Sequence, residues 1–374
     1  MQCFAQQFNH GPNHGLNHGL DQALNNGFTR PTRALWRHSW RALAVGLGVL
    51  LLSLQAPSAS LAQTSSPSAA QIQEAASFPT RAIRIVVPFP AAGTADLLPR
   101  IVGEKLSQRW GQPVLVENRP GAAGNIGAEM VYKAEPDGYT WISAPPPPFV
   151  INPGLYPKLG YDPLQFVPVT VMAAVPNVLL VNPKVPASTV QEFIAWVKAN
   201  PDRSNYASQG GGTTSHLTAE LFKTMAGGLR ITHIPYKGTA PALTDLLAGQ
   251  VEMMCDNLGV SLQHVRSGKL RALAVASERR IASLPGVPTL NETLPGFQSV
   301  AWFGVALPPK SSPAIAEKIS AAIAEVLRLP DVARRLVELS AEPVANSPAE
   351  MAAYMRQDAE RWRGVIRSAA VRLD

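Results

Sequence analysis

Short apolar runs alternate with amphipathic helical segments along most of this chain, and this alternation constrains the fold more than any other feature of the sequence. Ile83–Val87 is rich in β-branched residues and ends at Pro88, which predicts a buried strand. Leu98, Ile101 and Val102 then follow at the spacing of one helical face. Further strands are expected at 114–116, 139–143, 178–181, 205–207, 231–234, 251–255, 271–276 and 301–306, and helices at 126–134, 188–199, 216–226, 241–248, 313–328 and 348–367. The pattern predicts the α/β class, with mainly parallel sheets covered on both faces.

The length of 374 residues allows two ordinary domains, since single domains usually span about 100–200 residues. A hydrophobic content of 46% with 16% charged residues is typical of a globular chain and not of a disordered one. The alternating pattern starts only at Phe78. We expect residues 63–77, which are rich in Ser, Ala, Gln and Pro, to be a flexible linker into the fold.

Residues 1–62 are typical of a leader that contains a secretory signal peptide. Four arginines between positions 30 and 41 precede Ala42–Leu54, an apolar run of 13 residues that is too short to span a bilayer. Small residues at Ser60-Leu61-Ala62 predict cleavage near Ala62, which would place the mature chain in the periplasm. The Asn-His-Gly repeat upstream is interpreted as low-complexity leader and not as a metal site.

Charge and cysteine content narrow the function classes. The leader holds four of the 33 basic residues and one of the 26 acidic ones, so its removal lowers the net charge from +7 to +4. This mild excess suits anionic small molecules, but the chain lacks the clustered basic face that nucleic acid requires. Cys255 is the single cysteine left and stands in an apolar stretch, which predicts a buried strand thiol and no disulfide.

The segment Pro88–Asp96 joins a predicted strand to a predicted helix and consists mostly of small residues. Ligands of parallel α/β sheets bind beyond the carboxyl ends of the strands, where such loops gather. The start of the following helix offers unpaired N–H groups and about half a positive charge, which favours a carboxylate. The loop lacks the Gly-Lys-Ser/Thr of a nucleotide site. Asp96 is interpreted as a helix cap in preference to a ligand contact.

The segment Ser208–His216 repeats this arrangement with three consecutive glycines and a run of hydroxyl side chains. Two helix N-termini from different domains would hold a carboxylate from both sides, although an ordinary flexible turn explains the glycines equally well. A third glycine cluster, Gly121–Gly127, has the spacing GxxGxxG and misses the dinucleotide fingerprint.

No catalytic motif stands out in the sequence. Ser208, His216 and Asp256 would be the members of a hydrolase triad, but no GxSxG elbow surrounds the serine. The other histidines of the mature chain, His233 and His264, do not form a metal-ligand spacing with His216. We therefore predict no catalysis, no metal and no cofactor.

Several specific blocks of this sequence occur in the same order in a known family. They are 83–96, 116–121, 124–127, 136–140, 206–220, 234–238, 246–256, 267–272, 288–290 and 302–304. Together they resemble the Bug family, the periplasmic receptors of tripartite tricarboxylate transporters, over about residues 78–370. The resemblance implies a type II-like periplasmic binding protein with crossover hinge strands and a cleft that closes on the ligand. We expect domain 1 to comprise 78–178 plus 298–374, and domain 2 to comprise 179–297.

The resemblance also implies partners and a ligand site. The partners would be a small and a large membrane subunit of an ion-driven importer, with the receptor itself a monomer. A small carboxylate would be held, partly through ordered water, by backbone groups of the first loop and hydroxyls of the second. Carried over by position, these residues are Phe89, Ala91, Ala92, Gly93, Thr94, Ser208, Gly211, Thr213, Ser215 and His216. Asp256 matches a cleft position and either selects the distal part of the ligand or caps a strand end.

Two departures from the family pattern bear on the ligand. Ala92 stands where the family usually has glycine, and its methyl group would narrow the pocket or shift a backbone donor. Pro145–Pro148 replace a Gly/Ser-rich stretch, donate no N–H and are expected to form an extended wall of apolar surface that begins at Pro145. The usual dicarboxylate is then less favoured, and a bulkier or aromatic monocarboxylate is worth testing.

Three functions stay open on the sequence. The first is a receptor that delivers a carboxylate to a tripartite transporter. The second is a periplasmic hydrolase that uses Ser208 or Ser215. The third is a ligand-sensing receptor of the same fold that passes a signal to a membrane sensor.

Overall fold

The computed structural model describes residues 75–373. The predictions for the leader, the signal peptide and linker residues 63–74 lie outside this range. Within it, ten strands form one sheet, in which eight follow the hydrogen-bonded order β2-β1-β3-β9-β4-β7-β5-β6 and β8 and β10 each pair with β4 off this path. The strands are β1 Ile83–Val87, β2 Val114–Asn118, β3 Thr140–Ala144, β4 Val167–Val181, β5 Asn205–Ser208, β6 Thr232–Pro235, β7 Met253–Asn257, β8 Arg271–Val275, β9 Val300–Leu307 and β10 Glu342–Pro343.

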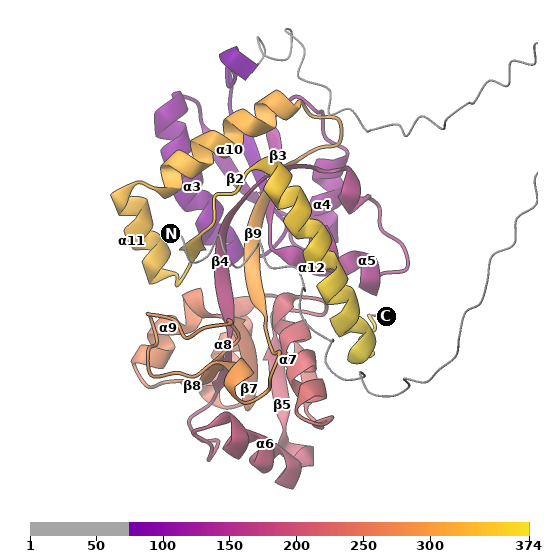
Figure 1. Ribbon diagram of the computed structural model, residues 1–374, viewed down its shortest axis with the longest axis vertical. Coiled ribbons are helices and arrows are strands. Elements are labelled where there is room, and N and C mark those ends of the chain that lie inside the picture. The colour runs from indigo at the N-terminus through magenta and orange to yellow at the C-terminus, as the bar shows by residue number, and fades with distance from the viewer. Residues whose placement is uncertain (1–74, 374) are drawn as a thin grey trace, which may run out of the picture. The chain divides into compact units, whose positions relative to one another are not determined.

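Parallel and antiparallel pairs occupy different parts of this sheet. β1 pairs in parallel with β2 and β3, and β5 pairs in parallel with β6 and β7, as the alternation of strands and helices predicted. β4 and β9 pair antiparallel with each other, and β4 also pairs antiparallel with β7 and β8. We call the part built on β1, β2, β3 and β9 lobe 1 and the part built on β5 to β8 lobe 2; β4 and β9 run between them in Figure 1.

The long strand β4 is shared by the two lobes. Its residues up to Pro176 pair with β9, whereas Asn177 and the residues after it pair with β7 and β8. The sequence predicted only 178–181 of this strand, because Pro168 and Pro176 lack the N–H that a ladder uses and interrupt the strand pattern. The strand keeps its pairing with β9 through two register shifts between Pro168 and Ala173.

Helices cover the sheet of each lobe (Figure 1). In lobe 1, α3, α10 and α12 pack on the sheet or on one another, and α7, α8 and α9 pack on the strands of lobe 2. No helix within residues 75–373 has both the length and the hydropathy needed to cross a bilayer. The helices are α3 Thr94–Trp110, α4 Asn125–Tyr132, α5 Asn152–Leu155, α6 Val190–Ala199, α7 Thr214–Met225, α8 Thr239–Ala248, α9 Leu258–Arg266, α10 Pro313–Leu327, α11 Pro330–Glu338 and α12 Pro348–Ser368.

The apolar strands and helix stripes predicted from the sequence form the buried interior. Trp141, Trp302 and Trp362 are among the largest fully buried side chains, and all three belong to lobe 1 elements. Cys255 lies in β7 and is fully buried, which confirms the expected strand thiol. The core is therefore built from apolar packing in both lobes.

Two local predictions were wrong in detail. The proline run does not form an extended wall: Pro146 has helical dihedrals and the turn η2, Pro147–Ile151, is a π-helix. Proline fits the first turn of a helix because the N–H that it lacks would be unpaired there. The helix expected at 188–199 begins at Val190, because the side chain of Thr189 accepts from Glu192 N and caps α6.

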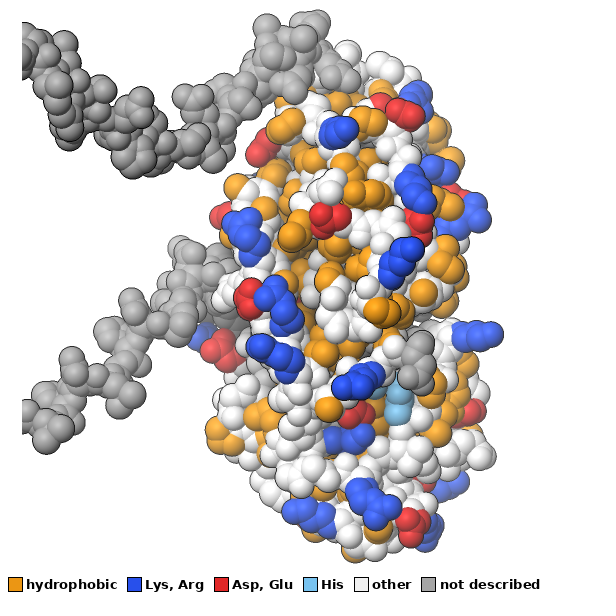
Figure 2. Space-filling view, turned by 90° about the vertical axis from the view of Figure 1, so that its right-hand side faces the viewer, with side chains coloured by type: hydrophobic (Ala, Val, Ile, Leu, Met, Phe, Trp, Pro, Cys, Tyr) orange, Lys and Arg blue, Asp and Glu red, His pale blue; other side chains and the backbone are white. Residues whose placement is uncertain are grey.

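Charged side chains do not gather in one patch on the face shown in Figure 2. Lysines and arginines are interspersed there with acidic residues, and apolar side chains gather over the upper lobe. Several of the arginines and lysines of the described residues are engaged in ion pairs such as Arg280 with Glu292 and Lys105 with Asp331.

Candidate ligand-binding site

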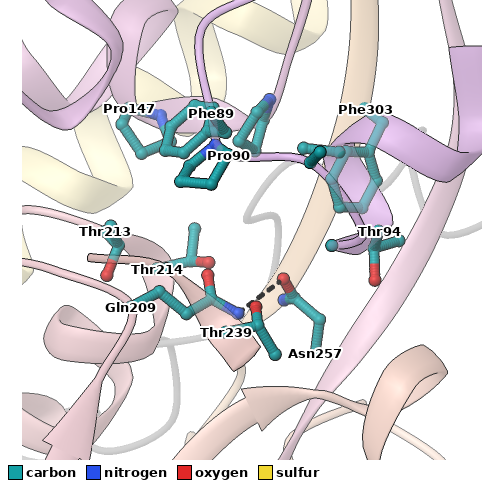
Figure 3. A pocket seen from close by; sticks show the side chains of 15 residues that line it. Phe89, Pro90, Thr94, Pro147, Gln209, Thr213, Thr214, Thr239, Asn257 and Phe303 are labelled. Atoms are coloured by element: carbon teal, nitrogen blue, oxygen red, sulfur yellow. Dashed lines mark hydrogen bonds between the residues drawn. The ribbon is translucent and has the colours of Figure 1, made fainter. Parts of the chain in front are cut away.

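A cavity of about 30 Å³ lies where loops of both lobes meet (Figure 3). Apolar side chains, among them Phe89, Pro147 and Phe303, come from lobe 1. Polar side chains come mainly from lobe 2. The lining residues are Phe89, Pro90, Ala91, Gly93, Thr94, Ala95, Pro145, Pro147, Gln209, Thr213, Thr214, Gly238, Thr239, Asn257 and Phe303. Room for a water molecule needs about 10–15 Å³ on this measure, so the cavity admits a group of the size of a carboxylate.

Four helices begin at this cavity. Its lining includes the first residues of α3, α7 and α8, namely Thr94, Thr214 and Thr239, together with Asn257, which precedes α9. The residues that precede α3, α8 and α9 make no side-chain cap, so first-turn N–H groups of these helices are not taken up by such a cap. Each helix start contributes up to about half a positive charge. None of the residues that line the cavity carries a charge, so backbone dipoles dominate its electrostatics.

Thr94 gives the cavity a hydroxyl that is ready for a ligand. Its side chain is 3% exposed, and Oγ1 has no hydrogen-bond partner in the protein. A buried hydroxyl without a partner costs free energy, which a bound acceptor recovers. Thr94 therefore marks the start of α3 as the side of the cavity that suits an anion.

Asp96 stabilises the first loop from the side that faces away from the cavity. Asp96 does not line the cavity; its Oδ2 accepts from Ala92 N at 3.0 Å, and its Oδ1 accepts from Arg100 Nε and Asn118 Nδ2, each at 2.9 Å. Burial alone would raise the pKa of Asp96, but these hydrogen bonds hold it below its usual value. The Ala92 N–H thus points to Asp96 and not to a ligand.

Three stacked rings support the second loop from below. The rings of His216 and His233 are 4.1 Å apart and inclined by 6°, and Tyr206 stacks on His233 at 4.7 Å. Burial lowers the pKa of His216 to about 4 and that of His233 to about 3. Both imidazoles are neutral at neutral pH, so they act as hydrogen-bonding groups and not as cations for an anionic ligand.

The stack fixes the glycines of the second loop. Gly212 N donates to His216 Nδ1 at 3.1 Å, and Gly210 N donates to Ser208 Oγ at 3.1 Å. Ser208 Oγ also lies 2.6 Å from His233 Nε2. The structure thus places Ser208 and His216 behind the loop, where they shape it without lining the cavity.

Ser215 and Asp256 also lie behind the cavity. Ser215 Oγ donates to Cys255 O, and its side chain is fully buried. Asp256 is fully buried and its Oδ1 accepts from Gln209 Nε2 at 2.7 Å. Burial raises the pKa of Asp256 to about 7, against the lowering effect of the bond from Gln209. Asp256 therefore reaches the cavity only through Gln209.

A larger recess of about 570 Å³ adjoins the cavity and shares Phe89, Gln209 and Thr213 with it. Gly211 lines this recess and not the inner cavity. Among the residues that line either space, Lys237 is the one with a charge. The recess provides room beyond the inner cavity for a longer ligand.

The structure brings six of the predicted site residues to the inner cavity: Phe89, Ala91, Gly93, Thr94, Pro145 and Thr213. Sequence reasoning did not select Gln209, Thr239, Asn257 or Phe303. Gln209 lies in the glycine-rich loop Ser208–His216, and its position in this loop could have identified it as a ligand contact. Thr239 is the first residue of α8, and Asn257 directly precedes α9. Their place at the cavity becomes visible only in the tertiary structure, where the ends of four strands meet.

Within residues 75–373, no group of three or more His, Cys, Asp or Glu side chains is placed to hold a metal ion. The cavity offers hydroxyls, amides and backbone N–H groups, which suit a small organic anion.

Two lobes joined by shared strands, with helix N-termini facing a cavity where the lobes meet, define a periplasmic solute-binding protein. The chain belongs to the tripartite tricarboxylate transporter family receptors, whose family model matches residues 98–371. This finding confirms the resemblance noted in the sequence.

Individual relatives agree with this assignment. The chain is 37% identical to Protein BugT of Bordetella pertussis over 299 residues, which are 79% of this chain and 91% of that protein. The structure of R. palustris Rpa4515 with adipate is 38% identical, with a TM-score of 0.76 over 79% of this chain and all of that one. MatC (Rpa3494) from Rhodopseudomonas palustris with bound malate is 34% identical, with a TM-score of 0.73 over 77% of this chain and 100% of that one.

Proposed function

We propose that this protein captures a small carboxylate in the periplasm and delivers it to the membrane subunits of a tripartite tricarboxylate-type transporter. The observation that carries the proposal is the meeting of four helix starts at one cavity with no charged lining residue. Helix starts and hydroxyls bind an anion at lower desolvation cost than a buried cation would, and they release it more readily. The relatives with adipate and malate bind ligands of this class.

The carbon skeleton of the ligand would meet apolar surface. Phe89, Pro145, Pro147 and Phe303 line the cavity on the side of lobe 1. Such a wall favours a hydrocarbon skeleton beside the carboxylate. We propose the signal peptide of residues 1–62, cleaved near Ala62, as the route of export.

The moving bodies in this proposal are the predicted domains, 78–178 plus 298–374 and 179–297. The change of partners in β4 between Pro176 and Asn177 supports a boundary at this point. Hinge closure about such shared strands would bring the two loops onto the ligand.

The hydrolase hypothesis gains no support from the two serines that it requires. Ser208 and Ser215 are fully buried, and neither lines the cavity or the recess. A nucleophile must reach the bond that it attacks.

The test is calorimetric titration of the purified protein with benzoate, hexanoate, adipate and malate, each paired with its neutral amide. We expect at least one carboxylate to bind, and its amide to bind at least about ten-fold more weakly. Thr94→Val should weaken binding of the carboxylate by about ten- to a hundred-fold, because a hydrogen bond to a charged group is worth about 1.5–3 kcal/mol. Thr224→Val, at an exposed position near the end of α7, is the matched control. Binding of the amides in preference to the acids would overturn the proposal.

A further inference from the structure

A line of buried hydrogen-bonding groups runs from the start of α7 to the floor of the cavity. It links the backbone carbonyl of Thr214 through Thr218, Ser299 and Asn177 to Asn257. Thr218, Ser299 and Asn177 are completely buried. Asn177 is also the first residue of β4 that pairs with lobe 2, so the line lies at the point where the two lobes are joined.

The hydrogens in this line have only one consistent arrangement. Thr218 Oγ1 lies 2.6 Å from the carbonyl oxygen of Thr214, which can only accept, so the threonine hydrogen is used there. Ser299 Oγ lies 2.6 Å from Thr218 Oγ1 and must therefore donate to it. Both hydroxyls are then left as acceptors. Asn177 Nδ2 donates to each of them at 3.0 Å.

This arrangement fixes the amide of Asn257. With its nitrogen turned to the hydroxyls, Asn177 presents Oδ1 to Asn257, whose Nδ2 donates to it at 2.9 Å. The oxygen of Asn257 is then directed to Gln209, whose Nε2 donates to it at 3.4 Å and to Asp256 Oδ1 at 2.7 Å. Asp256 thus orients Gln209 in the same way as Asn177 orients Asn257.

The amide oxygens are consequently the atoms that the floor offers to a ligand. Figure 3 shows the bond from the Gln209 nitrogen to Asn257, with the Gln209 oxygen turned toward the side where Phe89 and Pro90 lie. A carbonyl oxygen accepts hydrogen bonds and repels a carboxylate, because oxygen atoms of the same partial charge would meet. Donors lie beside these oxygens at the starts of α7 and α8, where Figure 3 shows Thr214 and Thr239, and Thr94 offers a further hydroxyl from lobe 1.

We infer that the ligand is a carboxylate with a hydrogen-bond donor, a hydroxyl or an ammonium group, at its other end, and that Asn177 is the positioning residue that sets this preference. The inference rests on the proposed function and narrows its substrate class. A dicarboxylate would place an acceptor where the floor also presents acceptors, and a simple alkanoate would offer no donor to the Gln209 oxygen.

The test compares compounds that share one carboxylate and differ only at the far end. The four-carbon series is butanoate, 4-hydroxybutanoate, 4-aminobutanoate and succinate, and the six-carbon series is hexanoate, 6-hydroxyhexanoate, 6-aminohexanoate and adipate. Calorimetry should show the hydroxy or amino compound of one series binding at least about ten-fold more tightly than its methyl and dicarboxylate counterparts. If a dicarboxylate binds most tightly, or the methyl compound binds equally well, this inference is wrong and the proposed function stands. If no carboxylate binds, both are wrong.

A variant separates positioning from general stability. Asn177→Ala removes the group that orients Asn257, and we expect the ratio of hydroxy-compound to methyl-compound affinity to fall to about two-fold or less. Asn182→Ala is the control, because it removes a buried amide that donates to Leu246 O at 2.7 Å and lines neither space. An unchanged ratio in Asn177→Ala overturns the role of Asn177. Where Asn177→Ala does not fold, Gln209→Leu removes one acceptor directly, and the ratio of hydroxy-compound to methyl-compound affinity should again fall to about two-fold or less. An unchanged ratio in this variant overturns the inference.

Discussion

Ala92 adopts a φ of 66°, in the left-handed region that costs a residue with a Cβ atom roughly 1–2 kcal/mol. Its N–H donates to Asp96, which holds the residue in this conformation. We predict that Ala92→Gly leaves the free energy of unfolding unchanged or raises it by up to about 1 kcal/mol, because relief of strain outweighs the added freedom of the unfolded chain. Urea denaturation measures the change.

The control for this prediction is the neighbouring alanine. Ala91 lies outside the left-handed region, so Ala91→Gly should lower the free energy of unfolding by about 0.5–1 kcal/mol. Equal losses in the two variants would show that Ala92 is not strained. The sequence showed that Ala92 replaces a glycine of the family pattern. It did not show the positive φ that explains why the family prefers glycine at this position.

At the scale of elements, β5, β6 and α7 are held together by the stack of Tyr206, His216 and His233, and this stack makes stability depend on pH. The folded pKa values of the two histidines, about 4 and about 3, lie below the unfolded value near 6.5. Between pH 6.5 and 4 the unfolded chain binds more protons, so stability falls with falling pH. Asp256, with a pKa of about 7, has the opposite effect between pH 7 and its unfolded value of 3.8, but two histidines outweigh it.

We therefore predict that the urea midpoint falls from pH 6.5 to pH 5. His216→Gln should flatten this dependence, because it leaves one histidine against one aspartate, and Asp256→Asn should steepen it. His264→Gln, on α9 and outside the stack, is the control. The same slope in the His216→Gln variant as in the parent protein would contradict the assignment.

The elements themselves were largely predictable where their apolar pattern is regular. β1 and β8 begin at the predicted residues, and α8 ends at Ala248 as expected. The prediction missed α9, which follows β7 directly, and α11, which starts at Pro330 one short turn after α10. Both are short, and their boundaries depend on packing against neighbours more than on a periodic stripe.

At the scale of the whole molecule, the closeness of the lobes predicts which glycines matter for binding. Gly238 has a φ of 106°, and a Cβ atom there would lie 3.0 Å from Cγ of Pro90 in the other lobe. Gly238→Ala should weaken carboxylate binding by at least about ten-fold, or about 1.4 kcal/mol, because closure would force the two loops apart. Calorimetry measures the affinity, and small-angle scattering with and without ligand measures closure.

Gly268 provides a matched control for this variant. It has a positive φ of 71°, but a Cβ atom there would meet nothing within 4 Å. Gly268→Ala should therefore strain the backbone locally and leave the affinity within about two-fold of the parent protein. Similar losses of affinity in both variants would indicate that strain, and not contact between the lobes, is responsible.

The sequence by itself determined the α/β class, the family and the two loops that open helices after strands, because hydrophobic period, turn residues and glycine spacing are local properties of the chain. Only the tertiary structure decided which side chains of those loops face the cavity. Ser208 and His216 turned behind their loop, whereas Gln209 and Asn257, from separate strands, came together at its floor. Which side chains face the cavity depends on how the shared strand β4 positions the two lobes. It also depends on the hydrogen-bond directions set at Asn177, which contacts Thr218 and Ser299, 41 and 122 positions away in the chain.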